Sequence, residues 1–182
     1  GGAVLGGGGA LSHHHHPPPP PPTPPGPAAP LRRPTELVLA TDLVVAAKTA
    51  RFGVPEVKRG LVAGGGALLR LPRRIPYQKA LELALTGDNF TAEDAAAWGF
   101  VNDLAERGQA LDRALALADR ITANGPIAVA VTKEVIVKAG EWSAEEMWQK
   151  QIELIAPVFT TQDAQEGAQA FAEKRTPNWT GK

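Results

Sequence analysis

The chain has 182 residues, of which 43% are hydrophobic, and its 19 basic residues equal its 19 acidic ones in number. This length predicts one domain, and the balanced charge argues against nucleic acid or an acidic membrane surface as the main partner. The absence of cysteine excludes disulfides and thiol nucleophiles, and the lack of a long apolar run or a signal-peptide pattern predicts a cytoplasmic protein.

Residues 1–34 have a composition of their own. Six glycines lie within the first nine residues, four histidines follow at His13–His16, and eleven of the 17 prolines fall between Pro17 and Pro34. Such a segment buries too little apolar surface to offset its ordering entropy, so we expect it to be disordered. The histidines have no Asp, Glu or Cys nearby to complete a metal site, so we expect no metal. An alternative role for the prolines is to bind a polyproline-recognising domain.

From residue 35 the chain has the pattern of a globular protein. We expect a short helix over Thr35–Thr41, with Pro34 in its first turn. The apolar run Asp42–Ala47 predicts a strand, and Phe52–Val57 predicts a second extended piece. The small residues Gly64–Gly66 predict a tight turn that allows a close approach to the backbone. They lack the pattern of a phosphate-binding loop.

The chain after Pro76 is mostly helical in pattern. Helices are expected over residues 77–86 with Gly87 as C-terminal cap, 92–98, 110–123, 126–139, 144–159 and 164–174. Capping boxes are expected at Thr91 with Asp94, Ser143 with Glu146, and Asp163 with Glu166. The predicted fold class is therefore α/β, with a small sheet that has too few strands to close its own core.

Two carboxylates are candidates for chemistry. Glu36 lies at the start of a predicted helix, where the dipole favours its ionised form. Glu56 follows Pro55 and precedes the glycine turn. Two positioned carboxylates can move the protons that adding or removing water beside a carbonyl requires. Backbone N–H groups of a glycine-rich turn can stabilise the oxyanion that develops.

Four segments in this order carry a resemblance to a known family: "TELVLATD", "ARFGVPEVKRGLVAGGGALLRLP", "ALELALTGDNFTAEDAAAWGFVN" and "EGAQAFAEKRTPNW". Together they resemble the enoyl-CoA hydratase/isomerase (crotonase) family over residues 35–182. The resemblance implies the C-terminal part of a spiral of ββα turns, followed by trimerisation helices. It also implies a homotrimer or hexamer that acts on an acyl-CoA thioester. Coenzyme A would be part of the substrate, with no other cofactor.

The resemblance also implies roles for individual residues. Glu36 and Glu56 match the two glutamates that activate the water added across the 2,3 double bond of an enoyl-CoA. Gly64 matches a glycine that lines the acyl pocket near this water. Phe171 and Lys174 match positions on a C-terminal helix that contact coenzyme A, often at a subunit boundary.

The N-terminal side departs from the family pattern. Arg33 stands at the position of a glycine whose N–H forms half of the oxyanion hole, and Pro34 favours an extended conformation there. Nothing in residues 1–34 resembles the upstream spiral turns. We therefore expect a truncated domain that is a poor enzyme by itself. The abrupt change of composition near Pro34 indicates a frame error or a wrongly placed start.

Other functions compatible with the sequence are a catalytically inactive family remnant and an oligomerisation or interaction protein. A carnitinyl-CoA dehydratase-like enzyme and an enoyl-CoA isomerase also remain alternatives, although the two glutamates favour a hydratase over an isomerase.

Overall fold

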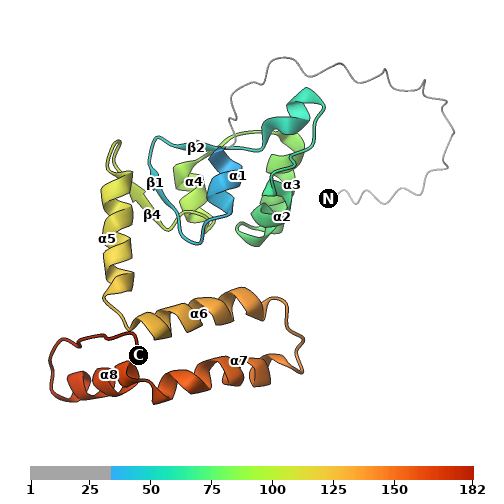
Figure 1. Ribbon diagram of the computed structural model, residues 1–182. Coiled ribbons are helices and arrows are strands. Elements are labelled where there is room, and N and C mark those ends of the chain that lie inside the picture. The colour runs from blue at the N-terminus through green and yellow to red at the C-terminus, as the bar shows by residue number, and fades with distance from the viewer. Residues whose placement is uncertain (1–33) are drawn as a thin grey trace, which may run out of the picture. The chain divides into compact units, whose positions relative to one another are not determined.

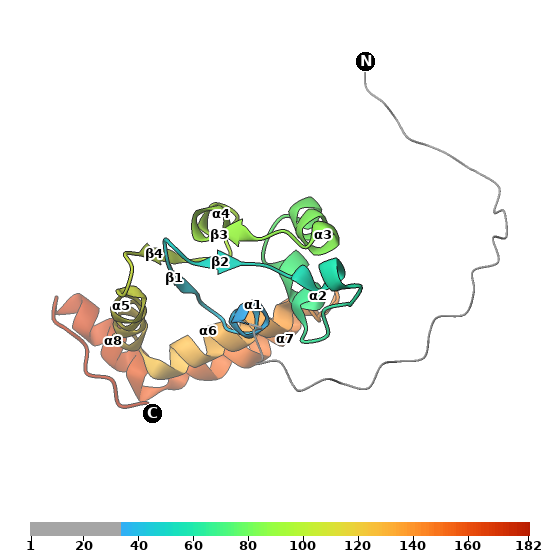
Figure 2. The same ribbon diagram turned by 90° about the horizontal axis from the view of Figure 1, so that it is seen from above.

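The computed structural model describes residues 34–182. Of residues 1–34, which we expected to be disordered, only Pro34 is described, and it begins a helix. The rest of that segment lies outside the described part, as do the expected histidine and proline roles. Figures 1 and 2 show its elements from two directions. In chain order they are α1 (Pro34–Leu39), β1 (Val45–Ala47), β2 (Arg51–Phe52), the 3₁₀ helix η1 (Pro55–Arg59), α2 (Ala67–Arg70), the 3₁₀ helix η2 (Leu71–Arg73), α3 (Tyr77–Thr86), β3 (Phe90–Thr91), α4 (Ala92–Ala97), β4 (Asp103–Ala105), α5 (Ala110–Thr122), α6 (Pro126–Ala139), α7 (Met147–Ile155), the 3₁₀ helix η3 (Ala156–Thr160) and α8 (Gln162–Ala172).

The strands of this part form two short sheets. β1 pairs in parallel with β4, with Val45 opposite Asp103, and β2 pairs in antiparallel fashion with β3. The side chain of Asn102 extends the first pairing, because its Oδ1 accepts the N–H of Val44 at 2.8 Å. The predicted strand over residues 42–47 is confirmed for its second half, and the expected small sheet is present in the described residues.

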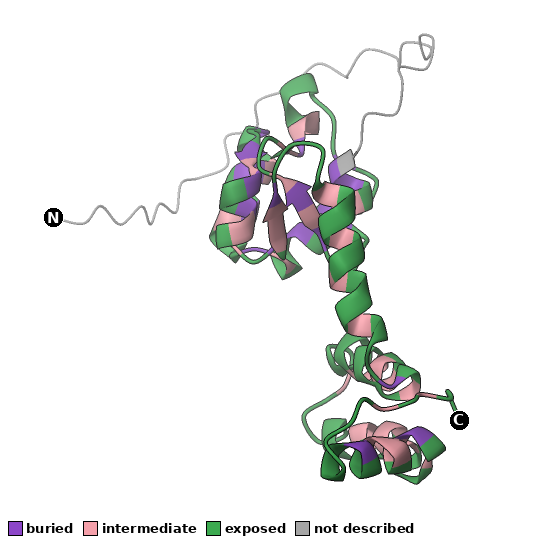
Figure 3. Cartoon of the chain, turned by 90° about the vertical axis from the view of Figure 1, so that its left-hand side faces the viewer, coloured by how far each residue is buried: buried purple, intermediate pink, exposed green. Residues whose placement is uncertain are grey.

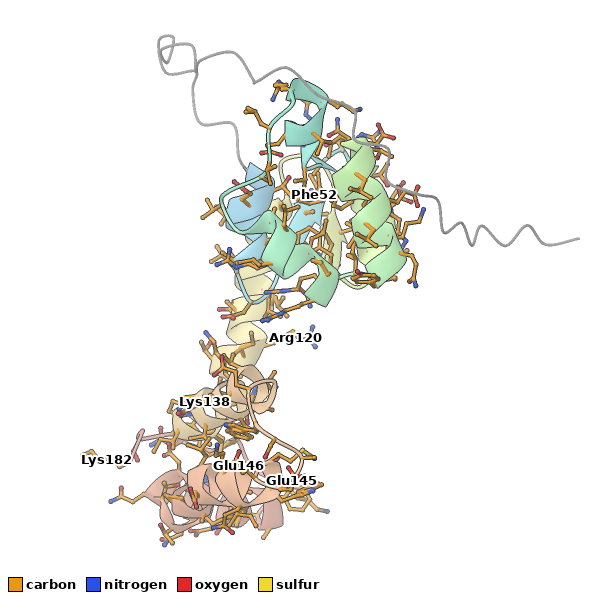
Figure 4. The ribbon with its side chains drawn as sticks, turned by 90° about the vertical axis from the view of Figure 1, so that its right-hand side faces the viewer. Phe52, Arg120, Lys138, Glu145, Glu146 and Lys182 are labelled. Atoms are coloured by element: carbon orange, nitrogen blue, oxygen red, sulfur yellow. The ribbon has the colours of Figure 1, made fainter. Side chains whose placement is uncertain are left out.

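Residues 34–105 enclose an apolar core between these sheets and helices α1–α4. Phe52, Phe90 and Phe100 meet at its centre, with ring centroids 5.2 to 6.4 Å apart. Leu39 and Leu71 are fully buried beside them. Figure 4 shows Phe52 in the interior of this region, and Figure 3 shows that most of the buried residues gather there.

The prediction of an extended piece over Phe52–Val57 is wrong for its second half, from Pro55 onward. Strand β2 ends at Phe52, and Pro55 begins the helix η1, because the fixed φ of proline suits the first turn of a helix. The helix ends at Gly60, which is left-handed with φ 68°. Glu56 is therefore held in a helical turn and not in a strand.

The helix caps match the predictions only in part. Thr91 and Asp94 form the expected capping box, and Gly87 ends α3 with φ 67°. Ser143 and Glu146 bond to each other, but α7 begins only at Met147. The box expected at Asp163 and Glu166 is wrong. Thr161 caps α8 instead, by accepting the N–H of Ala164, and this leaves both acids free for other contacts.

Helices α5–α8 bury little. Between residues 106 and 182 the buried positions are Gly125, Asp163 and Ala170, although exposed apolar side chains are frequent there. In the described part, no single helix is long and apolar enough to cross a membrane, and α5 with α6 meets that test only as a pair bent by 107°.

Candidate functional site

Glu36 is a buried acid on the first turn of α1. Only 8% of the residue is exposed, and its Oε1 accepts the backbone N–H of Gly65 at 2.7 Å. A Cβ added to Gly65 would lie 2.1 Å from the other carboxylate oxygen, so only a residue without a side chain fits there. The glycine turn thus permits the close backbone approach expected from the sequence, and a backbone donor fixes the Glu36 carboxylate.

Glu56 lies on the first turn of η1. In residues 34–182, one buried side-chain oxygen or nitrogen atom has no hydrogen-bond partner in the protein. This atom is Oε2 of Glu56. A buried carboxylate oxygen without a donor is costly, and in a native protein it calls for an explanation such as a catalytic role or a bound water molecule. This oxygen is therefore an acceptor suited to a donor that is not part of the chain.

Two consecutive residues of α1 hold the segment that carries Glu56. Thr35, which is also buried, accepts the N–H of Gly53 through Oγ1 at 3.1 Å. Glu36 accepts the N–H of Gly65 at the other end of the same segment. Because both ends are bonded to neighbouring positions on one helix, Glu36 and Glu56 belong to a single hydrogen-bonded unit.

The other sequence-predicted residues lie elsewhere. Gly64 is exposed, and a Cβ there would meet only open space, unlike one at Gly65. Arg33 lies outside the described residues. Phe171, which is 88% exposed, and Lys174 lie at the end of α8, so the structure does not bring them into the unit that holds the two glutamates (Figure 1).

Sequence reasoning missed two positioning residues, Thr35 and Gly65. A hydroxyl directly before Glu36 and three glycines in a row were the available signals, but neither indicates a hydrogen-bond partner remote in sequence. Within residues 34–182 no group of three or more His, Asp or Glu side chains is arranged to hold a metal. A cavity of about 540 Å³ beside α5 is lined by Leu43, Asn102, Asp103, Arg113, Ala116, Leu117 and Arg120, and so contains neither glutamate.

Known proteins similar to this chain point to one family. The family model described as enoyl-CoA hydratase/isomerase matches residues 35–182. An enoyl-CoA hydratase of Mycobacterium tuberculosis is 42% identical over 145 residues, covering 80% of this chain and 54% of the relative. A carnitinyl-CoA dehydratase of Salmonella paratyphi A is 38% identical over 151 residues, covering 81% and 58%.

Solved structures agree with the sequence relatives. The crystal structure of an enoyl-CoA hydratase from Mycobacterium marinum matches with a TM-score of 0.80 and 64% identity, covering 81% of this chain and 59% of that one. The expected crotonase-like α/β fold is thereby confirmed. The chain spans between about half and three-fifths of the length of the relatives it matches. Because the family model matches nearly all of the described residues, and these relatives exceed 35% identity, the chain belongs to the enoyl-CoA hydratase/isomerase family.

Proposed function

We propose that residues 35–182 are the part of an enoyl-CoA hydratase that carries its two acid–base residues, Glu36 and Glu56. The observation that carries this proposal is the buried, unpartnered Oε2 of Glu56, in the same hydrogen-bonded unit as the fixed carboxylate of Glu36. In a hydratase, a water molecule would donate the hydrogen bond that this oxygen accepts. The family relationship and the names of the relatives support the same reaction.

The reaction divides between the two carboxylates. The oxygen of water forms a bond to C3 of the enoyl-CoA while the C2–C3 π bond breaks. One carboxylate takes a proton from this water, and the other carboxyl group, in its acid form, gives a proton to C2. The rigid bond from Gly65 keeps Glu36 in place while charge shifts, and Glu56 keeps an acceptor free for the water. Gly64 would line the acyl pocket, Arg33 would contribute to the substrate site, and Phe171 and Lys174 would contact coenzyme A. No cofactor beyond the coenzyme A of the substrate is proposed. The negative charge on the thioester oxygen needs backbone N–H donors, which the upstream part of a complete domain would share in providing.

The test replaces Glu56 by Gln in a protein in which the upstream part of the family domain is joined to residues 35–182. Hydration of crotonyl-CoA, followed by loss of the conjugated thioester absorbance, should slow by about a hundredfold or more, because proton transfer is lost while shape is kept. KM should change little. Glu145→Gln, at an exposed position in the turn before α7, is the control and should leave both constants unchanged. A Glu56→Gln enzyme as fast as wild type would refute the assignment.

A second candidate reaction is the dehydration of carnitinyl-CoA, which the similarity to the Salmonella carnitinyl-CoA dehydratase favours. The same two carboxylates can remove water as well as add it, because each step is reversible. Incubating the upstream-restored protein with carnitinyl-CoA and with crotonyl-CoA separates the two, since the preferred substrate gives the larger kcat/KM.

The assembly and the segment division are proposals as well. Exposed apolar residues on α6–α8 support a homotrimer or hexamer: Ile136, Val137, Trp148, Ile152, Phe159 and Phe171 are each more than half exposed. Sedimentation of the chain at several concentrations tests the assembly, and a monomer at all of them would contradict it.

We also propose that residues 35–182 form the family domain, apart from residues 1–34, and that the protein acts in the cytoplasm.

A further inference from the structure

The last residues of the chain fold back against α8 through Asp163. This acid is 5% exposed, and its two oxygens accept the backbone N–H groups of Thr180 at 2.7 Å and Gly181 at 2.9 Å. The Thr180 hydroxyl donates a third bond at 3.1 Å, and the N–H of Asp163 donates to the carbonyl of Lys182 at 3.1 Å. A buried carboxylate with three donors fixes the backbone that supplies them.

A second acid of α8 holds the start of the same segment. The guanidinium of Arg175 donates to both oxygens of Glu166, at 2.7 and 3.0 Å. The backbone N–H of Asn178 donates to Glu166 at 2.7 Å, and Glu173 also bonds Arg175. Glu166 and Asp163 lie three residues apart and therefore on one face of α8. We refer to residues 175–182, held in this way, as the clasp.

The clasp also reaches the turn between α5 and α6. The indole N–H of Trp179 donates to the carbonyl of Ala123 at 2.8 Å. The ring of Trp179 lies over the backbone of Gly125 and Gly167, because a Cβ added to either would approach it to 3.7 or 3.2 Å. One aromatic side chain thus ties α8 to the α5–α6 turn.

Directly before the clasp, Lys174 has an unusual backbone. Its φ of 54° is the only positive φ among the non-glycine residues of the described part. It occupies the left-handed position after the helix, with its N–H donating to the Phe171 carbonyl and the N–H of Arg175 to the Ala170 carbonyl. Glycine is the usual residue here, and a side chain costs about 1 kcal/mol. Such strain persists only where the surroundings enforce it, and it gathers at functional sites.

We infer that Asp163 and Glu166 are positioning residues, which act through the clasp to hold Lys174 in this left-handed conformation and so to set the direction of its ammonium group towards coenzyme A. The inference rests on the proposed function for its ligand only. The carboxylates that anchor the clasp are on α8, about two and three turns before Lys174. Arg175, the residue directly after Lys174, donates to Glu166. A tail docked for stability alone would be better served by glycine at residue 174.

The experiment compares Asp163→Asn with the 182-residue wild-type chain, and Asp112→Asn, at an exposed site on the far end of α5, is the control. Amide hydrogen exchange should accelerate about tenfold or more at Thr180, Gly181 and Lys174 in Asp163→Asn, because charged acceptors are lost. Exchange at Phe100, in the core of residues 34–105, should not change. The affinity for coenzyme A, measured by calorimetry, should fall about tenfold. Trp179→Phe keeps an aromatic ring but loses the indole N–H that donates to the carbonyl of Ala123. It replaces Asp163→Asn in the experiment if that variant does not fold.

Three results would overturn the inference or part of it. Unchanged exchange in both variants overturns the clasp. Faster exchange with unchanged coenzyme A affinity overturns the positioning role. A wild-type chain that does not bind coenzyme A overturns the assignment of Lys174 in the proposed function. In that case loss of protection at Lys174 in Asp163→Asn still supports the clasp, and retained protection overturns it.

Discussion

Residues 34–105 and residues 126–182 belong to one chain but are held together by different forces. The first region buries a cluster of aromatic and aliphatic side chains around Phe52, Phe90 and Phe100. The second buries almost no apolar side chain, and hydrogen bonds to Asp163 and Glu166 fix its end. The two glutamates of the proposed reaction lie in the first region, and the proposed coenzyme A contacts lie in the second.

This difference indicates how each region should respond to change. A core held by burial depends on side-chain volume and is insensitive to a single surface charge. A clasp held by charged hydrogen bonds depends on the protonation state and on backbone conformation. The exposed apolar residues of α6–α8 are the surface that another chain would cover in the proposed assembly.

The largest effect should come from the core of the first region. Phe100 is 1% exposed and packs against both Phe52 and Phe90. Phe100→Ala should lower the free energy of unfolding by about 3–5 kcal/mol, because burial is lost and a cavity remains. Denaturant unfolding measures it.

The matched control for this change is Phe171→Ala on α8. Phe171 is 88% exposed, so its removal should change the stability of a monomer by no more than about 0.5 kcal/mol. If the two substitutions cost the same, the contrast between the regions is wrong, or Phe171 is buried in an assembly.

Gly65→Ala should have the next largest effect, and it acts on the unit that holds the proposed catalytic residues. The new Cβ would lie 2.1 Å from a carboxylate oxygen of Glu36, so the carboxylate must move and lose its bond to the residue 65 N–H. We expect a loss of about 1–3 kcal/mol in the free energy of unfolding. Gly64→Ala, one residue earlier in open space, is the control, and equal losses in both variants would refute the positioning of Glu36 by Gly65.

Much of the first region could be predicted from the sequence, because periodicity, caps and the glycine at 87 are local signals. The capping box of Thr91 and Asp94 and the helix over 77–86 follow from neighbouring residues alone. The partnership of Thr35 with Gly53, and of Glu36 with Gly65, depends on chain segments 18 and 29 residues apart, which no local pattern encodes. The helical state of Glu56 was missed because proline suits both an extended segment and the first turn of a helix.

The acids of α8 teach the same lesson at the other end of the chain. Asp163 and Glu166 have the spacing of a capping box, but Thr161 supplies the cap, and the clasp takes both carboxylates. Residues 175–182, which follow the end of α8, decide the competition between a local cap and a returning segment. A spacing rule therefore identified the right residues and assigned them the wrong partners.

Acid should release the clasp. Arg175, followed by the N–H of Asn178, lowers the pKa of Glu166 from 4.5 to about 2, and the N–H groups of Thr180 and Gly181 lower the pKa of Asp163. Because both pKa values are depressed in the folded chain, their contribution is present above the unfolded pKa and is lost as the pH falls from about 4.5 towards 2.

The indole N–H of Trp179 reports this release, through its exchange or its NMR signal as the pH is lowered at low salt. Glu173 also faces the clasp, because it accepts a hydrogen bond from Arg175, which lowers the pKa of Glu173 as well. Asp163→Asn should remove part of the pH dependence. A clasp signal that is constant from pH 5 to pH 2 would mean that packing of Trp179, and not the carboxylates, holds the segment.

The smallest effect, and the one that separates stability from function, belongs to Lys174. Replacing it by glycine removes the cost of a side chain at φ 54°, so the unfolding free energy of the second region should rise by about 1 kcal/mol. Lys174→Ala loses the same ammonium group without relieving the backbone, and it should be no more stable than wild type. Thermal unfolding and the calorimetric affinity for coenzyme A are measured for both. If glycine stabilises while both variants bind coenzyme A more weakly, the chain retains a strained lysine for binding at the expense of stability. If glycine gives no stability over alanine, the clasp does not hold residue 174 in the left-handed conformation, and the comparison between the two regions loses its link to function.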